Sequence, residues 1–213
     1  MNKLISILVD NDSWILPYAL KLKNLLQDRG YKVSLLTSAQ DIPVGWVVFF
    51  LGCINIVENY LLDRNDHSLV VHESKLPQGK GFSPVQWQIL DGCNEIPILL
   101  IDADSNADTG DIWLEDKIVL NGTELEDEWR ALQGDKTIEI CLKFVDNHNS
   151  LSKKSQLGSE SFYRRRNPSD SVLDVNKTII EQFNLLRIVN NKKYPAHFFI
   201  NNIKYVLTIH KDD

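Results

Sequence analysis

The chain has 213 residues, of which 43% are hydrophobic and 24% are charged, the balance of an ordinary globular protein and not of a disordered or fibrous one. Acidic residues outnumber basic ones by 29 to 23, and this surplus disfavours partners bound through phosphate charge, namely nucleic acid and anionic membranes. The length allows one domain, or one domain with an appendage.

The N-terminal segment argues against export. Its apolar run, 4–9, meets Asp10 and Asp12 at once, whereas a signal peptide needs a longer apolar stretch. The longest apolar stretch, 43–56, is interrupted by two glycines and is too short to span a bilayer. The cysteines share no metal-ligand spacing and are typical of reduced thiols: Cys53, Cys93 and Cys141. We expect a cytoplasmic protein without a metal site.

The first third of the chain alternates strand-like and helix-like segments. Apolar runs rich in Leu, Ile and Val occur at 4–9, 31–37, 46–51 and 69–72. Helical spacing of apolar residues predicts helices at 15–26, closed by Gly30, and at 57–62. This β-α-β order predicts an α/β fold with a Rossmann-like, open, mostly parallel sheet.

The middle third continues the alternation. Ser83 followed by Pro84 predicts the start of a short helix. Strands are expected at 96–101 and 112–120. Thr123 and Glu126 predict a capping box that opens a long amphipathic helix, which ends near Asn147.

The composition changes after the long helix. Residues 147–161 are small and polar and predict a loop. A helix over 175–189 follows, and 197–210 forms two strand-like runs around Asn201 and Asn202, the pattern of a tight hairpin. We therefore expect a catalytic domain over 1–147 and an extension of loop, helix and hairpin over 148–213.

The segment 70–111 carries the residues of chemical interest. His72 ends an apolar strand, where open α/β sheets place their ligands. The loop after it contains two glycines, two prolines and a lysine and leads into a helix N-terminus, which suits an anionic group. Asp108 lies between two predicted strands and could reach His72, and a His–Asp pair serves proton transfer near neutral pH. These features alone predict an α/β enzyme of unknown reaction.

The order of residues in this segment resembles the signature of formyltransferases that use 10-formyltetrahydrofolate. The matching positions are His72, Ser74, Leu76, Pro77, Gly81, Pro84, Trp87, Gly92, Asp108, Gly110, Asp111 and Ile112. Gly52 and Cys53 end the third strand where that family has its folate-facing turn. The resemblance extends over about residues 1–146 and implies the formyltransferase type of sheet.

The C-terminal part resembles one branch of that family, the amino-sugar N-formyltransferases. The stretch from Arg164 to Ser171, a helix with Asn184 and Arg187, and the pair 195–196 before a hairpin follow that branch's pattern. The methionyl-tRNA branch has a larger, basic C-terminal domain, so the acidic composition and the short tail both disfavour tRNA. The purine-biosynthesis branch lacks this tail.

The resemblance implies an N-formyltransferase acting on a nucleotide-linked deoxyamino sugar, destined for a surface polysaccharide or glycan. The amine would attack the formyl carbon, His72 would stabilise the tetrahedral oxyanion, and Asp108 would orient His72 and help to deprotonate the amine. The folate would contact Gly52 and Cys53, and its pterin would be framed by Asp102, Ala103, Asp104, Ser105 and Asn106. The candidates for the nucleotide pyrophosphate are Lys80, Arg164, Arg165 and Arg166. A homodimer through the hairpin is left open.

One position departs from the family pattern. Val70 stands where the family has an Asn that holds the formyl oxygen, and loss of such a donor typically costs about 2.7–4 kcal/mol of barrier. A donor such as Asn94 or a backbone N–H could replace it, protonated His72 could act alone, or the protein could bind both ligands and catalyse feebly. We expect an active enzyme. The alternatives are a formyltransferase for a different amine and a folate- or nucleotide-binding protein that lost its chemistry.

Overall fold

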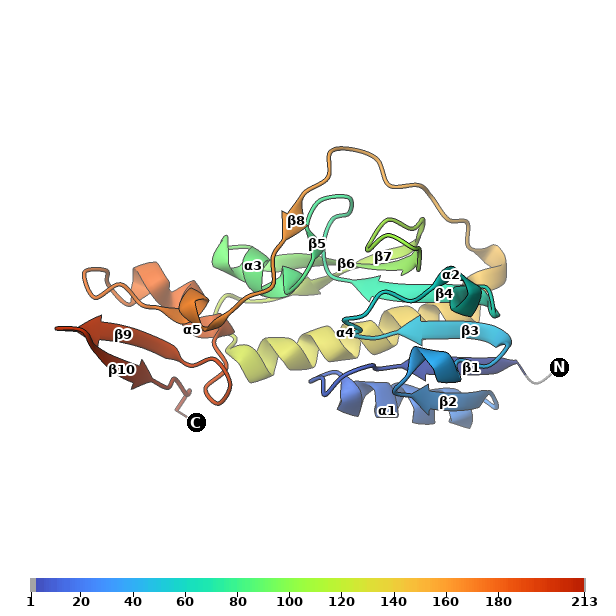
Figure 1. The fold of residues 1–213 in the computed structure, drawn as a ribbon, viewed down its shortest axis with the longest axis horizontal. Helices are drawn as coiled ribbons and strands as arrows, with labels where there is room; N and C mark the ends of the chain where they lie inside the picture. Colours follow the sequence, from blue (N-terminus) through green and yellow to red (C-terminus); the bar gives the residue numbers. More distant parts are fainter. Residues whose placement is uncertain (1–2, 213) are drawn as a thin grey trace.

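The computed structural model describes residues 3–212 and is built around one six-stranded sheet (Figure 1). Its strands run in the order β2-β1-β3-β4-β6-β7. Their bounds are β1 (Leu4–Leu8), β2 (Lys32–Leu36), β3 (Gly45–Phe50), β4 (Asn65–His72), β6 (Glu95–Asp102) and β7 (Ile112–Val119). The first four strands are parallel to one another, while β6 is antiparallel to β4 and β7 is antiparallel to β6. The predicted mostly parallel α/β sheet is confirmed.

Two helices cover one face of this sheet. They are α1 (Leu16–Asp28) and the long α4 (Glu126–Asn147), and they bury apolar side chains against β1 and β3. The opposite face is covered in part by α2 (Asn59–Leu62), and α3 (Pro84–Leu90) packs beside the antiparallel strands. Among the helices of residues 3–212, none combines the length and apolar composition that crossing a membrane requires.

The long helix begins differently from the predicted capping box. The Glu128 carboxylate accepts a hydrogen bond from the Leu125 backbone N–H at 2.8 Å, so the cap lies two residues later than the expected pair Thr123 and Glu126. The Thr123 side chain instead donates to Asn121. The position was wrong because an acidic first turn offers several carboxylates that can serve an N-terminal N–H.

The C-terminal part leaves the main sheet after α4. A chain segment over 151–161 leads to β8 (Phe162–Tyr163), which pairs with β5 (Lys80–Gly81) in a separate two-stranded sheet. The helix expected over 175–189 is wrong in length: α5 spans only Phe183–Ile188, after a 3₁₀ turn at Ile180–Gln182. The hairpin of β9 (Ala196–Ile200) and β10 (Ile203–Leu207) is confirmed, and Asn201 and Asn202 both adopt positive φ at its turn.

Candidate active site

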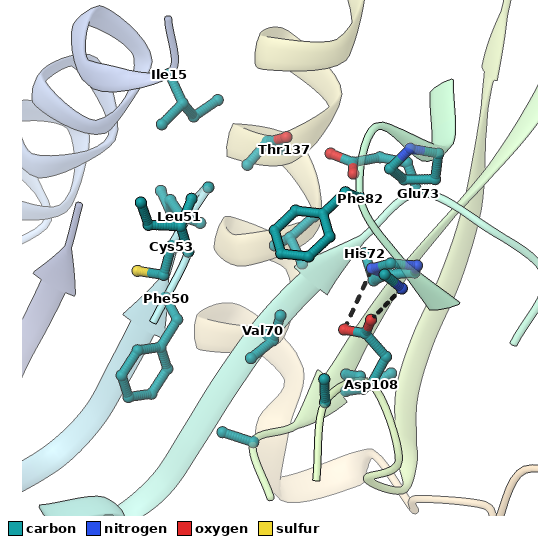
Figure 2. A pocket seen from close by; sticks show the side chains of 18 of the residues that line it. Ile15, Phe50, Leu51, Cys53, Val70, His72, Glu73, Phe82, Asp108 and Thr137 are labelled. Atoms are coloured by element: carbon teal, nitrogen blue, oxygen red, sulfur yellow. Dashed lines mark hydrogen bonds and ion pairs between the residues drawn. The ribbon is translucent and has the colours of Figure 1, made fainter. Parts of the chain in front are cut away.

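A cavity of about 450 Å³ opens at the carboxyl ends of β3 and β4 (Figure 2). Its walls are largely apolar and are contributed by β3, β4, β6 and the segments that follow them. Apolar lining residues include Phe50, Leu51, Ile54, Val57, Leu62, Val70, Phe82, Val85 and Ile101. Polar lining residues include Asn55, His72, Glu73, Asp102, Asp104, Asn106, Asp108, Arg130, Gln133 and Thr137. An apolar cavity with a few convergent polar groups is the usual form of a small-molecule site.

His72 and Asp108 meet in this cavity, as the sequence predicted. The Nδ1 atom of His72 lies 3.3 Å from Oδ1 of Asp108, and both side chains are largely buried (Figure 2). The second oxygen of Asp108 accepts a hydrogen bond from the Gly81 N–H at 2.8 Å. Asp108 itself has a positive φ of 57°, a conformation that the loop between β6 and β7 holds to present the carboxylate to His72.

Both nitrogens of the His72 ring face acceptors. Nδ1 faces the Asp108 carboxylate, and Nε2 lies 2.9 Å from the carbonyl oxygen of Gly79. A neutral imidazole has one N–H and can donate to only one of these oxygens, whereas the doubly protonated ring donates to both. The two acceptors together fix the orientation of the ring in the cavity.

The loop that carries Gly79 is held by β8. The Gly79 N–H donates to Ser161 Oγ at 2.9 Å, and the Phe82 N–H donates to the Tyr163 carbonyl at 3.0 Å. Gly81 has a φ of +95°, and a Cβ there would lie 2.5 Å from the Tyr163 carbonyl oxygen. The glycine therefore permits the close approach of β8 to this loop.

The departure at position 70 is visible in the cavity wall. Val70 lines the cavity and packs with apolar neighbours on both sides. Asn94 lies beside Gly122 and is not among the residues that line the cavity. Asn94 therefore does not replace the Asn side chain that the family has at position 70. The cavity group that can donate a hydrogen bond to the formyl oxygen in its place is the His72 ring.

The residues expected to face the folate mostly line the cavity. Gly52, Cys53, Asp102, Ala103, Asp104 and Asn106 do so, whereas Ser105 does not. Asp102 is also bound by Lys153 Nζ at 2.7 Å and by the Trp113 indole N–H at 2.7 Å, so its side chain anchors the loop. Burial, with a smaller effect of the Asp10 charge, raises the pKa of the Cys53 thiol to about 12, which keeps it protonated.

The four basic residues expected at the pyrophosphate lie outside the cavity lining. Lys80 is buried, and its Nζ contacts Glu160 at 2.7 Å. Arg164 forms an ion pair with Asp170, and Arg166 donates to the Asp170 carbonyl at 3.1 Å. Arg165 is exposed and lies over the ring of Phe82, 4.6 Å from its centroid. Three of the four thus bind groups of the protein itself.

The sequence reading missed a polar group on the α4 side of the cavity. Gln133 Nε2 donates to Glu73 Oε1 at 2.6 Å, and Arg130 Nη1 donates to Gln133 Oε1 at 3.0 Å. Burial raises the pKa of Glu73 above its ordinary value, against the hydrogen bond from Gln133. A signal was present, because Glu73 directly follows His72 and the spacing of 130, 133 and 137 places those residues on one face of a helix.

A metal centre finds no support. Within residues 3–212 there is no group of three or more His, Cys, Asp or Glu side chains that could hold an ion.

Comparison with known proteins identifies formyltransferases. No family model matches the chain. A methionyl-tRNA formyltransferase of Lachnospira eligens is 30% identical over 131 residues, which are 60% of this chain and 41% of that protein. A methionyl-tRNA formyltransferase of Syntrophomonas wolfei is 26% identical over 188 residues, 86% of this chain and 55% of that protein. The chain thus spans about half the length of the curated relatives it matches.

Solved structures share the whole fold. Methionyl-tRNA formyltransferase from Clostridium thermocellum superposes with a TM-score of 0.79 at 18% identity, over 100% of this chain and 94% of that one. A 4-N formyltransferase from Francisella tularensis gives 0.76 at 16% identity, over 99% and 98%. HypX from Aquifex aeolicus in complex with tetrahydrofolic acid gives 0.78 at 13% identity, over 98% of this chain and 38% of that one. The chain thus shares the fold of these formyltransferases.

Proposed function

We propose that this protein transfers a formyl group from 10-formyltetrahydrofolate to the amine of a nucleotide-linked amino sugar. The observation that carries the proposal is the His72–Asp108 pair, held 3.3 Å apart in the wall of a cavity of about 450 Å³. The neighbour from Francisella tularensis is a 4-N formyltransferase, and the neighbour from Aquifex aeolicus binds tetrahydrofolic acid. Both likenesses support the proposal without identifying the acceptor.

The cavity suits a reduced folate. Phe50, Leu51 and Ile101 offer apolar walls to a flat heteroaromatic ring, and the loop over 102–107 offers polar groups to its edge. Bound there, the donor would supply an activated formyl carbon beside His72. The lining of the cavity is thus compatible with 10-formyltetrahydrofolate as the donor in formyl transfer.

In this proposal His72 handles the negative charge. As the amine attacks, charge grows on the formyl oxygen, and a preorganised N–H stabilises it. Before the reaction the Nε2–H of His72 points to the Gly79 carbonyl oxygen. As charge grows on the formyl oxygen, the Nε2–H would donate to that oxygen instead, because hydrogen bonds to ionised acceptors are stronger. In this proposal the His72 ring takes the role of the amide that the family has at the position of Val70.

Asp108 has the complementary role. Its Oδ1 faces His72, and its Oδ2 is fixed by the Gly81 N–H. The carboxylate holds the His72 ring in orientation and accepts the proton that the amine must lose before the formamide forms. Collapse of the tetrahedral intermediate would then break the bond between the formyl carbon and N10 of the folate, and N10 would take up this proton as tetrahydrofolate leaves. A carboxylate placed by two contacts loses little freedom when the acceptor binds.

For the acceptor, Arg165 is our remaining candidate contact to the diphosphate. It makes no ion pair within residues 3–212, and it lies against Phe82, which lines the cavity. The proposed product is a formamido sugar made in the cytoplasm for a surface polysaccharide or glycan. The curated relatives favour methionyl-tRNA as a second candidate acceptor, against which the net charge of −6 argues.

The C-terminal hairpin is our candidate homodimer surface. Large apolar side chains are exposed on both of its strands: Phe199, Ile200, Ile203, Tyr205 and Val206. A two-stranded hairpin is marginally stable by itself in water, and a second copy would cover these residues. Light scattering after size exclusion should give the dimer mass, and Val206→Lys should shift it to the monomer. A monomeric wild type at 50 μM would contradict this proposal.

The proposed function is tested by a thermal-shift panel. The protein is melted with 5-formyltetrahydrofolate, with each nucleoside diphosphate and with CMP, because a ligand of the native state raises the melting temperature. Stabilisation by the folate and by one nucleotide supports the proposal and identifies the sugar carrier. Stabilisation by the folate alone points to a different amine, and methionyl-tRNA is then assayed directly. No stabilisation by either overturns the proposed function.

A further inference from the structure

The polar group on the α4 side of the cavity has no part in the proposed transfer. It consists of Glu73, Gln133 and Arg130, and we call it the α4 triad. Figure 2 places Glu73 on the side of the cavity toward α4, while the His72–Asp108 contact lies nearer β4 and the loop of Asp108. Glu73 and His72 line the same cavity, so one ligand can contact both the triad and the reacting centre.

The Glu73 carboxylate has one satisfied oxygen and one free oxygen. Oε1 accepts the hydrogen bond from Gln133 at 2.6 Å. Oε2 makes no hydrogen bond to any residue from 3 to 212, although the side chain is half-buried and lines the cavity. Oε2 is therefore an acceptor that a donor group of a ligand in the cavity can reach.

The guanidinium of Arg130 is held in place by its neighbours, and one of its nitrogen atoms has no hydrogen-bond partner in the described chain. Its guanidinium lies between Trp14 and Trp129, 4.4 Å from the centroid of each ring. Nε donates to Glu126 at 3.2 Å, and Nη1 donates to Gln133, while Nη2 has no partner in the described chain. The triad thus offers one acceptor and one donor to the cavity, in fixed relative positions.

The charges of this region select against anions. The acidic side chains here, Glu73, Glu126 and Asp108, are at least as many as the basic ones, Arg130 and His72, so a phosphate or carboxylate would find no surplus of positive charge. A thioether or aliphatic side chain would leave Oε2 of Glu73 without a partner. A hydroxyl group both donates and accepts hydrogen bonds. It therefore matches the unpaired acceptor Glu73 Oε2 and the unpaired donor Arg130 Nη2.

We propose that the α4 triad is a subsite for hydroxyl groups next to the reacting amine of the acceptor. The inference rests on the proposed function and narrows its acceptor to a hydroxylated ring. One hydroxyl donates to Glu73 Oε2, and the same or the adjacent hydroxyl accepts from Arg130 Nη2. Glu73 and Arg130 are thus specificity-determining residues, distinct from the residues that handle the formyl group.

Glu73→Gln tests this subsite with little change of shape. The amide oxygen still accepts the bond from Gln133, while the amide NH₂ replaces Oε2 and turns the free acceptor into a donor. Glu128→Gln is the matched control, because Glu128 lies on α4 and its carboxylate binds the exposed Lys211. Folding of both variants is checked by thermal melting and by their affinity for 5-formyltetrahydrofolate.

The measurement is calorimetric titration in the presence of 5-formyltetrahydrofolate, which prevents turnover. The probes are a UDP-linked and a dTDP-linked amino hexose, each compared with its analogue that lacks the hydroxyl next to the amine. Glu73→Gln should weaken binding of the hydroxylated probe by about 10- to 100-fold and leave the deoxy probe within about twofold. Glu128→Gln should change neither.

Three results would overturn the subsite: Glu73→Gln binds both probes as the wild type does, it weakens both equally, or the wild type binds neither probe. Failure of the proposed function is a separate outcome. If the wild type binds the hydroxylated probe through Glu73 but forms no formamide with 10-formyltetrahydrofolate, the subsite stands and the proposed reaction does not.

Discussion

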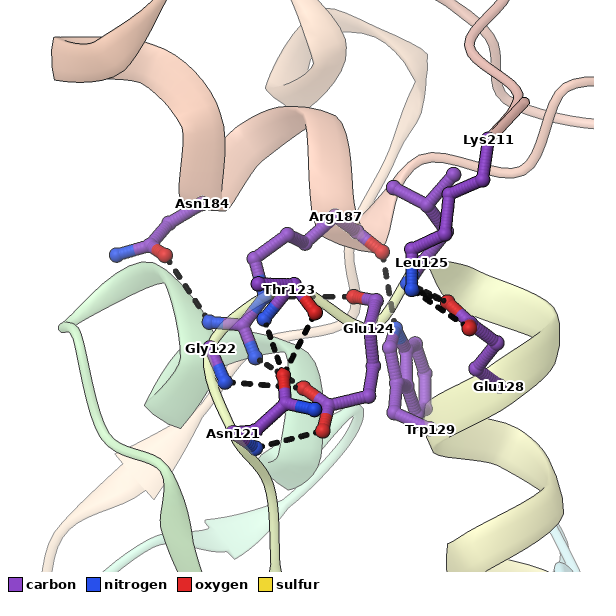
Figure 3. Close-up of polar contacts among 10 residues, drawn as sticks. All are labelled: Asn121, Gly122, Thr123, Glu124, Leu125, Glu128, Trp129, Asn184, Arg187 and Lys211. Carbon is purple, nitrogen blue, oxygen red and sulfur yellow. Dashed lines mark hydrogen bonds and ion pairs between the residues drawn. The ribbon is translucent and has the colours of Figure 1, made fainter. Parts of the chain in front are cut away.

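Arg187 and Glu124 form an ion pair in the protein interior that joins the C-terminal extension to the start of α4 (Figure 3). Nη2 of Arg187 lies 3.3 Å from Oε2 of Glu124, and the side chain of Arg187 is 1% exposed. The same guanidinium donates to the Asn184 side chain, and the Trp129 indole donates to the Arg187 carbonyl. Asn184 and Arg187, noted in the sequence as features of one family branch, thus have a structural role that fixes α5 against the N-terminal end of α4.

The first prediction concerns this ion pair. Arg187→Met leaves the Glu124 carboxylate buried without its cation, and we expect a loss of about 3–5 kcal/mol in the free energy of unfolding. Urea unfolding followed by circular dichroism measures the change. Arg29→Met is the control, because Arg29 pairs with Asp146 at the surface and should lose less than about 1 kcal/mol. Equal losses in the two variants would mean that the buried Arg187–Glu124 pair contributes no more to the free energy of unfolding than the surface pair does.

The second prediction concerns the reacting pair. His72→Asn and Asp108→Asn should each lower kcat by about 10²- to 10⁴-fold, because each removes a group that stabilises charge or moves a proton. Affinity for 5-formyltetrahydrofolate should change little, since the apolar walls remain. His210→Asn, at an exposed position, serves as the control. An unchanged kcat in His72→Asn would refute the assigned role.

The third prediction concerns pH. Burial raises the pKa of Glu73, so the folded state favours its neutral form, and this group's contribution to stability is lost as pH rises through its folded-state pKa. Glu73→Gln cannot ionise, so its melting temperature relative to the wild type should rise from pH 5 to pH 8.

Glu128→Gln provides a control that should not respond over this pH range. The hydrogen bond and charge of Lys211 hold the pKa of Glu128 below its ordinary value, so that carboxylate stabilises the fold above its unfolded-state pKa. The melting temperature of Glu128→Gln relative to the wild type should therefore stay nearly constant from pH 5 to pH 8, because this carboxyl titrates only at lower pH. A parallel response of both variants would contradict the assignment for Glu73.

The fourth prediction concerns thiol reactivity. Burial raises the pKa of both Cys53 and Cys141, so neither forms the reactive thiolate near pH 8, whereas Cys93 is exposed. Iodoacetamide at pH 8 should modify Cys93 alone, as measured by peptide mass spectrometry. Rapid modification of Cys53 would show that the cavity opens more than the structure implies.

The sequence predicted much of the fold because alternating apolar runs and helical spacing are local signals. It could not predict that β6 and β7 run antiparallel to β4, since an apolar run carries no direction. It brought His72 and Asp108 together because both follow strands of one sheet. The contact of Glu73 with Gln133 depends on how α4 packs across the sheet, 60 residues away in the chain, and no local pattern reports that.

The pairing of β5 with β8 has a consequence for the order in which the protein is made. The loop that holds His72 through Gly79 receives its own support from Ser161, 82 residues later in the chain, and from Glu160. A nascent chain that has emerged only as far as the end of α4 carries His72 and Asp108 but lacks the strand that fixes this loop. The loop beside His72 therefore gains its support only after the segments that form most of the main sheet have been made.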